Sequence, residues 1–245
     1  MRAALERIRP DVVFNCAAYN AVDAAESDPD PAFDVNARGP AVLAAECSRL
    51  GARLVHFSTN YVFDGSADRP YREADDPNPL SAYARSKREG ELAVLPAGLV
   101  IRTAGVYGLV GSAVKGGSFP ERILARARAG QPLRVVDDQR LNPTSARDLA
   151  AATLALVGTG ATGLVHLVAD GCCSWRELAA ETLRLAGVAA EVEAVTTAAL
   201  GAAAPRPLNG CLESGRVPPL RHWRAALKDY WEAIQTRSAV DTHPM

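Results

Sequence analysis

Lysine is scarce in this sequence, and neither sign of charge is in excess. Lys87, Lys115 and Lys228 are the only lysines among 27 basic residues, so arginine fills most cationic positions. The basic residues face 28 acidic ones, which gives a formal net charge of -1 and no basic stripe. No nucleic acid partner is therefore expected. No apolar run approaches the ~20 residues that a membrane span needs, so no membrane association is expected either.

The cysteines lack the spacing of a metal site. Five are present, and they form no CxxC pattern and no Cys/His ligand pattern. We therefore predict no metal site, and we expect the thiols to be buried and reduced. The opening stretch MRAALERIRPD carries charge at intervals and has no apolar signal-peptide centre. These observations predict a cytoplasmic protein.

Short apolar runs alternate with longer helical patterns along most of the chain. Strands are predicted at 11–16, 53–58, 99–103 and 133–136, and helices at 31–50, 79–95, 119–129 and 146–157. This alternation is typical of βαβ units and predicts an α/β fold with a doubly wound, Rossmann-like parallel sheet.

After Gly158 the predicted elements become shorter. A strand is expected at 163–167 and a helix from Ser174, with Glu177 completing a capping box. A last helix is expected at 220–234. We predict a cofactor-binding and catalytic region over residues 1–158 and a small substrate lobe over most of residues 159–245.

One predicted helix carries a tyrosine and a lysine four residues apart. Tyr83 and Lys87 lie in the stretch SAYARSKREGE, and this spacing places them on one helix face. Thr59 follows the predicted strand LVHFS, and ligands of parallel sheets bind beyond the carboxyl ends of the strands. A hydroxyl, a phenol and an ammonium that converge there can make a proton donor with a tuned pKa. An exposed helix that carries the pair by chance is the alternative.

Several long stretches together resemble the dTDP-4-dehydrorhamnose reductases, a family of extended short-chain dehydrogenase/reductases. The resemblance covers nearly the whole chain and rests on RPDVVFNCAAYNAVDAAES, VNARGP, ARLVHFSTNYVFDG, YREADDPNPLSAYARSKREGE, VIRTAGVYG and DDQRLNPTSARDLA. It implies an NAD(P)H-dependent oxidoreductase that reduces the 4-keto group of a nucleotide-activated deoxysugar. NADPH is the implied cofactor, and NADH could also serve.

The resemblance also implies roles for individual residues. Tyr83 would be the proton donor, and Thr59 would hydrogen-bond the reacting oxygen. Lys87 would hold the nicotinamide ribose and lower the pKa of Tyr83 by its charge.

The implied binding residues come from four parts of the chain. Those expected at the cofactor, besides Tyr83 and Lys87, are Ala17, Ala18, Tyr19 and Asn20. Those expected at the nucleotide-sugar substrate are Thr59, Asn60, Gly105 and Arg206. Lys115 is a further candidate for the substrate diphosphate.

The sequence departs from the family at the expected sugar pocket. Asn60 stands where an aspartate is usual, and Gly105 stands where a tryptophan often walls the sugar. Leu141 and Asn142 precede the later PT motif, where a glycine is usual. We expect Gly105 to open space for a sugar that is bulkier or differently substituted.

The chain also lacks the GxxGxxG turn that holds the cofactor diphosphate in the family. This implies an N-terminally incomplete sheet, weak NADPH binding, and an uncovered edge at Val12, Val13 and Phe14. A second copy or another partner could pair with that edge. The alternative function is a non-catalytic, NADP-binding regulatory subunit similar to the methionine adenosyltransferase β subunit. An epimerase of the same superfamily fits less well.

Overall fold

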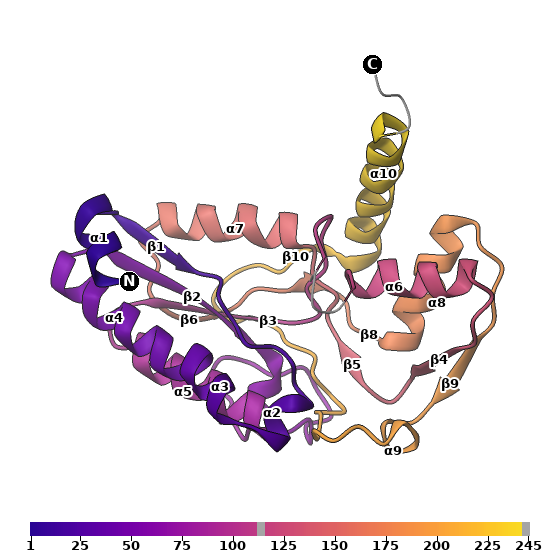
Figure 1. The fold of residues 1–245 in the computed structure, drawn as a ribbon, viewed down its shortest axis with the longest axis horizontal. Coiled ribbons are helices and arrows are strands. Elements are labelled where there is room, and N and C mark those ends of the chain that lie inside the picture. The colour runs from indigo at the N-terminus through magenta and orange to yellow at the C-terminus, as the bar shows by residue number, and fades with distance from the viewer. Residues whose placement is uncertain (112–115, 242–245) are drawn as a thin grey trace.

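A parallel four-stranded sheet forms the centre of the larger part of the molecule (Figure 1). The computed structural model describes residues 1–111 and 116–241, so Lys115 lies outside the described residues. The strands lie in the order β1 (Val12–Asn15), β2 (Arg53–Thr59), β3 (Leu99–Thr103) and β6 (Gly163–His166). The predicted α/β fold class with a parallel sheet is confirmed.

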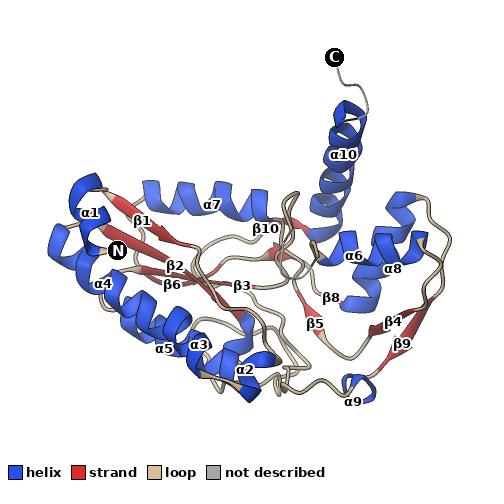
Figure 2. Ribbon diagram, viewed as in Figure 1, coloured by secondary structure: helices blue, strands red, loops and turns tan. Residues whose placement is uncertain are grey.

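Helices cover both faces of this sheet (Figure 2). On one face lie α4 (Gly39–Leu50) and α5 (Ala82–Val94), and on the other lies α7 (Ala146–Gly158). Leu54 packs in the cluster under α4 and α5, whereas its neighbour Val55 packs in the cluster under α7. Successive side chains of a strand point to opposite faces, so one apolar run supplies both layers.

The predicted helix at 31–50 is a series of three helical segments. It consists of α3 (Asp30–Phe33), a π-helical turn η1 (Asp34–Arg38) and α4. The turn lies against α5, where a Cβ at Gly90 would come within 2.1 Å of the Asn36 carbonyl oxygen. Glycine therefore allows the two backbones to meet. The shorter helices α1 (Arg2–Ile8) and α2 (Ala24–Ser27) precede this series.

Strand β1 lies at an edge of the sheet. It pairs with β2 only among the described strands, and Phe14 is 40% exposed. The expected uncovered edge is therefore present in the described part of the chain. A partner at this edge stays a prediction.

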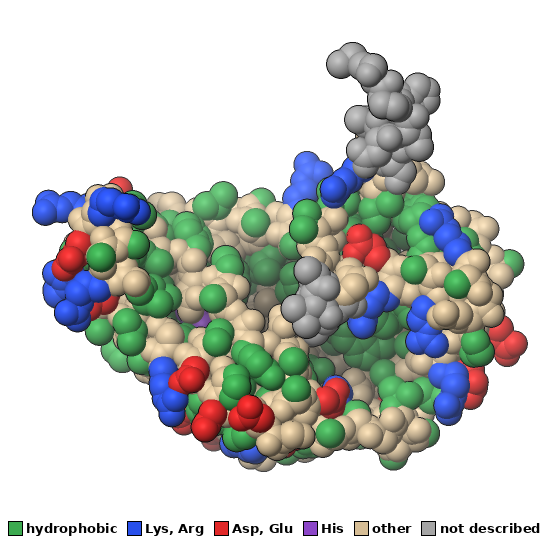
Figure 3. Space-filling view, viewed as in Figure 1, with side chains coloured by type: hydrophobic (Ala, Val, Ile, Leu, Met, Phe, Trp, Pro, Cys, Tyr) green, Lys and Arg blue, Asp and Glu red, His purple; other side chains and the backbone are tan. Residues whose placement is uncertain are grey.

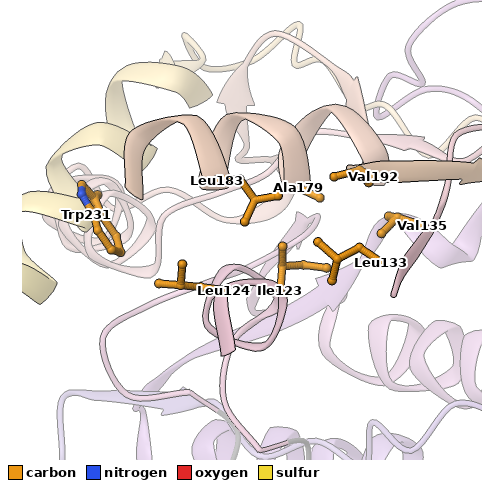
Figure 4. Packing of buried hydrophobic residues seen from close by; sticks show 8 residues of the cluster. All are labelled: Ile123, Leu124, Leu133, Val135, Ala179, Leu183, Val192 and Trp231. Carbon is orange, nitrogen blue, oxygen red and sulfur yellow. The ribbon is translucent and has the colours of Figure 1, made fainter. Parts of the chain in front are cut away.

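The smaller part packs helices against a two-stranded sheet. Its elements are α6 (Phe119–Arg128), β4 (Leu133–Val136), α8 (Trp175–Ala186), β9 (Val192–Val195), α9 (Thr197–Leu200) and α10 (Trp223–Asp241). Strands β4 and β9 are parallel, and α6, α8 and α10 bury a common apolar cluster with them (Figure 4). The predicted division of the chain at Gly158 stays a prediction. The smaller part contains α6 and β4, which precede Gly158, as well as α8, β9 and α10, which follow it.

Short strands join the two parts. Antiparallel β5 (Arg140–Leu141) pairs with β8 (Cys173–Ser174), and β7 (Ala169–Asp170) pairs with β10 (Leu220–His222). The last predicted helix therefore begins at Trp223, because residues 220–222 extend to pair with β7. A single 3-10 turn, η2 (Asn60–Val62), follows β2.

The cysteines differ from the expectation of buried, reduced thiols. Cys47 and Cys173 are buried and free, as expected. Cys172 and Cys211 form a disulfide and Cys16 is exposed, so the expectation is wrong for these three. Within residues 1–111 and 116–241, none of the helices combines the length and apolar composition needed to cross a bilayer.

Candidate active site

A cavity of about 510 Å³ opens beyond the carboxyl ends of β1, β2 and β3. Its lining comes from the segments that follow these strands, from the start of α6, and from β5 and α8. In Figure 3 the surface is hollowed between the two parts of the molecule. This is the end of a parallel sheet at which ligands bind.

Helix α5 brings both residues of the predicted pair to the cavity. Ser81 begins the helix, and its hydroxyl accepts a hydrogen bond from the backbone N–H of Ala84. Tyr83 and Lys87 then follow on one face, and both line the cavity with Thr59. The structure thus brings together the three residues predicted for catalysis.

The phenol of Tyr83 is held in its protonated form. Burial raises the pKa of Tyr83 to about 12, and the hydrogen bond with the Thr59 hydroxyl opposes this only in part. The ring of Tyr61 meets that of Tyr83 edge-on, with centroids 5.9 Å apart. The expected lowering of the Tyr83 pKa by Lys87 is wrong for this structure, because burial outweighs the interactions that favour the phenolate.

The ammonium of Lys87 lies at the floor of the cavity. Lys87 is 2% exposed, and its Nζ donates a hydrogen bond of 2.6 Å to the Phe57 carbonyl. Burial lowers the pKa of Lys87 to about 8, and the Glu91 carboxylate opposes that effect. The neighbouring His56 is buried, and burial together with the Lys87 charge lowers its pKa to about 3. Lys87 is thus a cation next to a neutral imidazole.

Glu91 is a buried carboxylate that the sequence analysis missed. It is fully buried, and both of its oxygens accept hydrogen bonds of 2.8 Å from the Arg102 guanidinium. Burial alone would raise the pKa of Glu91, but the Arg102 hydrogen bonds and charge lower it overall. Tyr83, Lys87 and Glu91 are spaced four apart, and this spacing could have revealed the third member.

Thr59 and Asn60 are joined by their side chains. The Thr59 hydroxyl accepts a hydrogen bond from the Tyr61 backbone N–H and donates one of 3.3 Å to Asn60 Oδ1. Asn60 is 4% exposed, and its Nδ2 donates a hydrogen bond of 2.9 Å to the Gly210 carbonyl. Asn60 lines the cavity, but both ends of its amide already have protein partners.

Gly105 does not leave the open space that we expected. Its φ is +53°, and a Cβ there would come within 2.5 Å of Leu141 Cδ1. Leu141 is 4% exposed and lines the cavity beside Gly105. Leu141 occupies the place that a Cβ at residue 105 would take, and the expected bulkier or differently substituted sugar stays a prediction. An aliphatic side chain forms this wall.

The predicted cofactor-binding segment lines the cavity only in part. Ala18 and Asn20 line the cavity, whereas Ala17 and Tyr19 are not among its lining residues. Asn36 holds the backbone of Tyr19 by two hydrogen bonds of 2.9 Å, and the Tyr19 ring packs against a cluster of alanines. Cys16 also lines the cavity and was not predicted.

Arg206 lies in an ion pair instead of at the cavity surface. Its Nη2 is 2.7 Å from Asp23 Oδ2, and its Nη1 donates to the Ala204 carbonyl. Two other arginines, Arg122 and Arg140, line the cavity. No local pattern distinguishes these two from the many other arginines, because only the tertiary packing brings them to the cavity.

Known proteins are similar to this chain over most of its length. The model of the family described as RmlD substrate binding domain matches residues 1–236. The dTDP-4-dehydrorhamnose reductase of Streptomyces griseus is 41% identical over 253 residues, which cover 97% of this chain and 82% of that protein. A probable dTDP-4,6-dihydroxy-2-methyloxan-3-one 4-ketoreductase of Streptomyces antibioticus is 43% identical, over 96% of this chain and 81% of that protein.

A solved structure is also similar. The dTDP-4-dehydrorhamnose reductase of Bacillus anthracis in complex with NADP superposes with a TM-score of 0.90 at 30% identity. The match covers 95% of this chain and 84% of that one. Relatives named as reductases do not favour the alternative of a non-catalytic regulatory subunit.

Proposed function

Because this chain belongs to the RmlD substrate binding domain family, we propose that it is an NADP(H)-dependent oxidoreductase that reduces the 4-keto group of a nucleotide-activated deoxysugar. The observation that carries the proposal is the convergence of Thr59, Tyr83 and Lys87 on one cavity at the carboxyl end of the sheet. The reductases among its relatives support the substrate class.

The residues around Lys87 fit a nicotinamide cofactor. An ammonium has three N–H donors, and the hydrogen bond to the Phe57 carbonyl uses one. The remaining donors can bind the ribose hydroxyls of the nicotinamide half. Ala18 has a short side chain at the cavity surface, which lets a flat ring approach the backbone. When bound, the reduced cofactor supplies the hydride, and NADH could replace NADPH in this role.

Tyr83 holds the proton that the reduction consumes. Hydride addition to the ketone carbon leaves an alkoxide on the substrate oxygen, and the Tyr83 hydroxyl donates its proton to that oxygen. Thr59 orients the phenol through their shared hydrogen bond.

Arg122 and Arg140 can bind the charged half of the substrate. A nucleotide diphosphate is an anion, and guanidinium groups bind phosphate oxygens through charge-assisted hydrogen bonds. Both arginines line the same cavity as Tyr83. We place the diphosphate here, whereas contact of Arg206 with the substrate stays a prediction, since Arg206 is not among the residues that line the cavity.

The test is reduction of a panel of 4-keto nucleotide sugars by the purified chain, followed by loss of NADPH absorbance. Lys87→Met should abolish the reaction and weaken NADPH binding. Lys228→Met is the matched control, because Lys228 is exposed on α10. Absence of turnover with every sugar in the panel, or equal activity of the two variants, would refute the proposal.

The proposed substrate and cofactor are both metabolites of the cytoplasm, so we also propose a cytoplasmic location. Fractionation of the source cells tests it, and recovery of the chain outside the cytoplasm contradicts it.

A further inference from the structure

We infer that Asn60 is a positioning residue that ties Thr59 to the backbone at Gly210, and that it is not a contact for the sugar. This inference rests on the proposed function for its catalytic meaning. The observation behind it is a continuous chain of hydrogen bonds from Thr59 through Asn60 to Gly210.

The orientation of the Asn60 amide follows from its partners. The Gly210 carbonyl can only accept a hydrogen bond, so the NH₂ group of Asn60 must face it. The amide oxygen is then directed at the Thr59 hydroxyl, which donates to it. An aspartate at this position would lose the donor and bring a carboxylate oxygen against the Gly210 carbonyl. The asparagine therefore matches a position that needs an acceptor on one side and a donor on the other.

Gly210 is fitted to the Asn60 side chain. A Cβ at Gly210 would come within 2.3 Å of Asn60 Nδ2 and 3.2 Å of the Arg140 carbonyl oxygen. The Gly210 backbone N–H donates a hydrogen bond of 2.8 Å to that same carbonyl. Gly210 is thus held between Asn60 and β5, and a larger residue would push the amide out of place.

The segment that follows Gly210 is fixed to the rest of the molecule. The Cys211 carbonyl accepts a hydrogen bond of 2.8 Å from the Tyr71 backbone N–H, and Cys211 is disulfide-bonded to Cys172. The Leu212 backbone N–H donates a hydrogen bond of 2.7 Å to Asn142 Oδ1. The position of the Gly210 carbonyl is therefore well defined. Asn60, which is hydrogen-bonded to both residues, holds Thr59 in place relative to it.

The first test separates positioning from substrate contact by steady-state kinetics. Asn60→Ala should lower kcat about 10- to 100-fold with little change in KM, because displaced catalytic groups lose rate. Gly210→Ala should lower kcat to a similar extent. Gly215→Ala is the control, since a Cβ at Gly215 meets nothing within 4 Å. In a Thr59→Ala background, Asn60→Ala should have almost no further effect on kcat. A raised KM at unchanged kcat, or an undiminished effect in that background, would overturn the inference.

The second test needs neither cofactor nor substrate. The Tyr61 backbone N–H donates to Thr59 Oγ1, so its hydrogen exchange reports whether Thr59 is held. In Asn60→Ala the protection of Tyr61 should fall about tenfold, the factor expected for losing one ordinary hydrogen bond. Gly215→Ala should leave it unchanged, and thermal melting should show both variants folded. If the wild-type protein lacks reductase activity but the Tyr61 N–H loses protection in Asn60→Ala, the proposed function fails. The inference that Asn60 ties Thr59 to Gly210 then still holds. Unchanged protection in folded Asn60→Ala refutes that inference itself.

Discussion

Replacement of Glu91 by glutamine should destabilise the protein far more than the loss of one ordinary ion pair. Glu91 accepts two hydrogen bonds from Arg102 and one from Arg88, all at 2.8 Å. The Glu91 side chain has no exposed area, and that of Arg102 is 1% exposed. In Glu91→Gln the guanidinium of Arg102 stays buried next to a neutral amide that can offer it only one acceptor.

The burial of Glu91 and Arg102 sets the size of the expected loss in the free energy of unfolding. Removal of one partner from a buried ion pair typically costs about 3–5 kcal/mol, because the remaining charge is left without compensation in a medium of low polarity. Arg134 and Glu193 form a comparison pair at 3.3 Å with side chains that are 52% and 61% exposed. An exposed pair of this kind is worth at most about 1 kcal/mol.

Urea unfolding of wild-type, Glu91→Gln and the matched control Glu193→Gln measures the difference. The midpoint should fall by roughly 1–2 M in Glu91→Gln and stay nearly constant in Glu193→Gln, given the usual dependence of stability on urea. The double variant Glu91→Met/Arg102→Met should recover much of the loss, since apolar replacement of a whole buried pair is often neutral. Equal midpoints for Glu91→Gln and Glu193→Gln would show that the reasoning from burial is wrong.

Three further predictions concern the cavity. Tyr83→Phe should lower turnover at least about 100-fold with little change in NADPH affinity, as expected for loss of a positioned acid, and near-wild-type reduction would contradict this role. NADPH affinity, measured by calorimetry, should be highest below pH 8 and should fall as the pH rises through about 8, where Lys87 loses its proton. In Glu91→Gln the fall should occur at lower pH, because the Glu91 carboxylate raises the pKa of Lys87, and a pH-independent affinity would refute the role of the ammonium. Leu141→Ala should raise kcat/KM for bulkier 4-keto sugars relative to smaller ones, because Leu141 forms the wall beside Gly105, and an unchanged ranking in competition assays would exclude that wall from the sugar pocket.

The features that the sequence predicted well depend on local chemistry. Ser174 and Glu177 form the expected capping box at the start of α8. Tyr83 and Lys87 reach the same cavity because their spacing alone places them on one face of α5. In these cases the residues that decide the structure are within four positions of each other.

The features that could not be predicted depend on residues far apart in the chain. Asn60 finds its partner 150 positions away at Gly210, and Arg206 pairs with Asp23 across 183 positions. Leu220 continues a helical pattern, yet it extends as a strand since β7 offers it backbone partners. Such contacts depend on how the two parts of the molecule meet, and periodicity carries no information about that.

The way in which the smaller part is assembled has a consequence for the order of folding. Arg134 of β4 meets Glu193 of β9 across 59 positions, and between them the chain returns to the central sheet as α7 and β6. During synthesis, β1, β2 and β3 with their helices can collapse as soon as they emerge, whereas α6 and β4 must wait for partners made much later. Closing so long a loop delays these contacts. The apolar faces of α6 and β4 are therefore the surface that a nascent chain leaves exposed longest and that a chaperone would meet first.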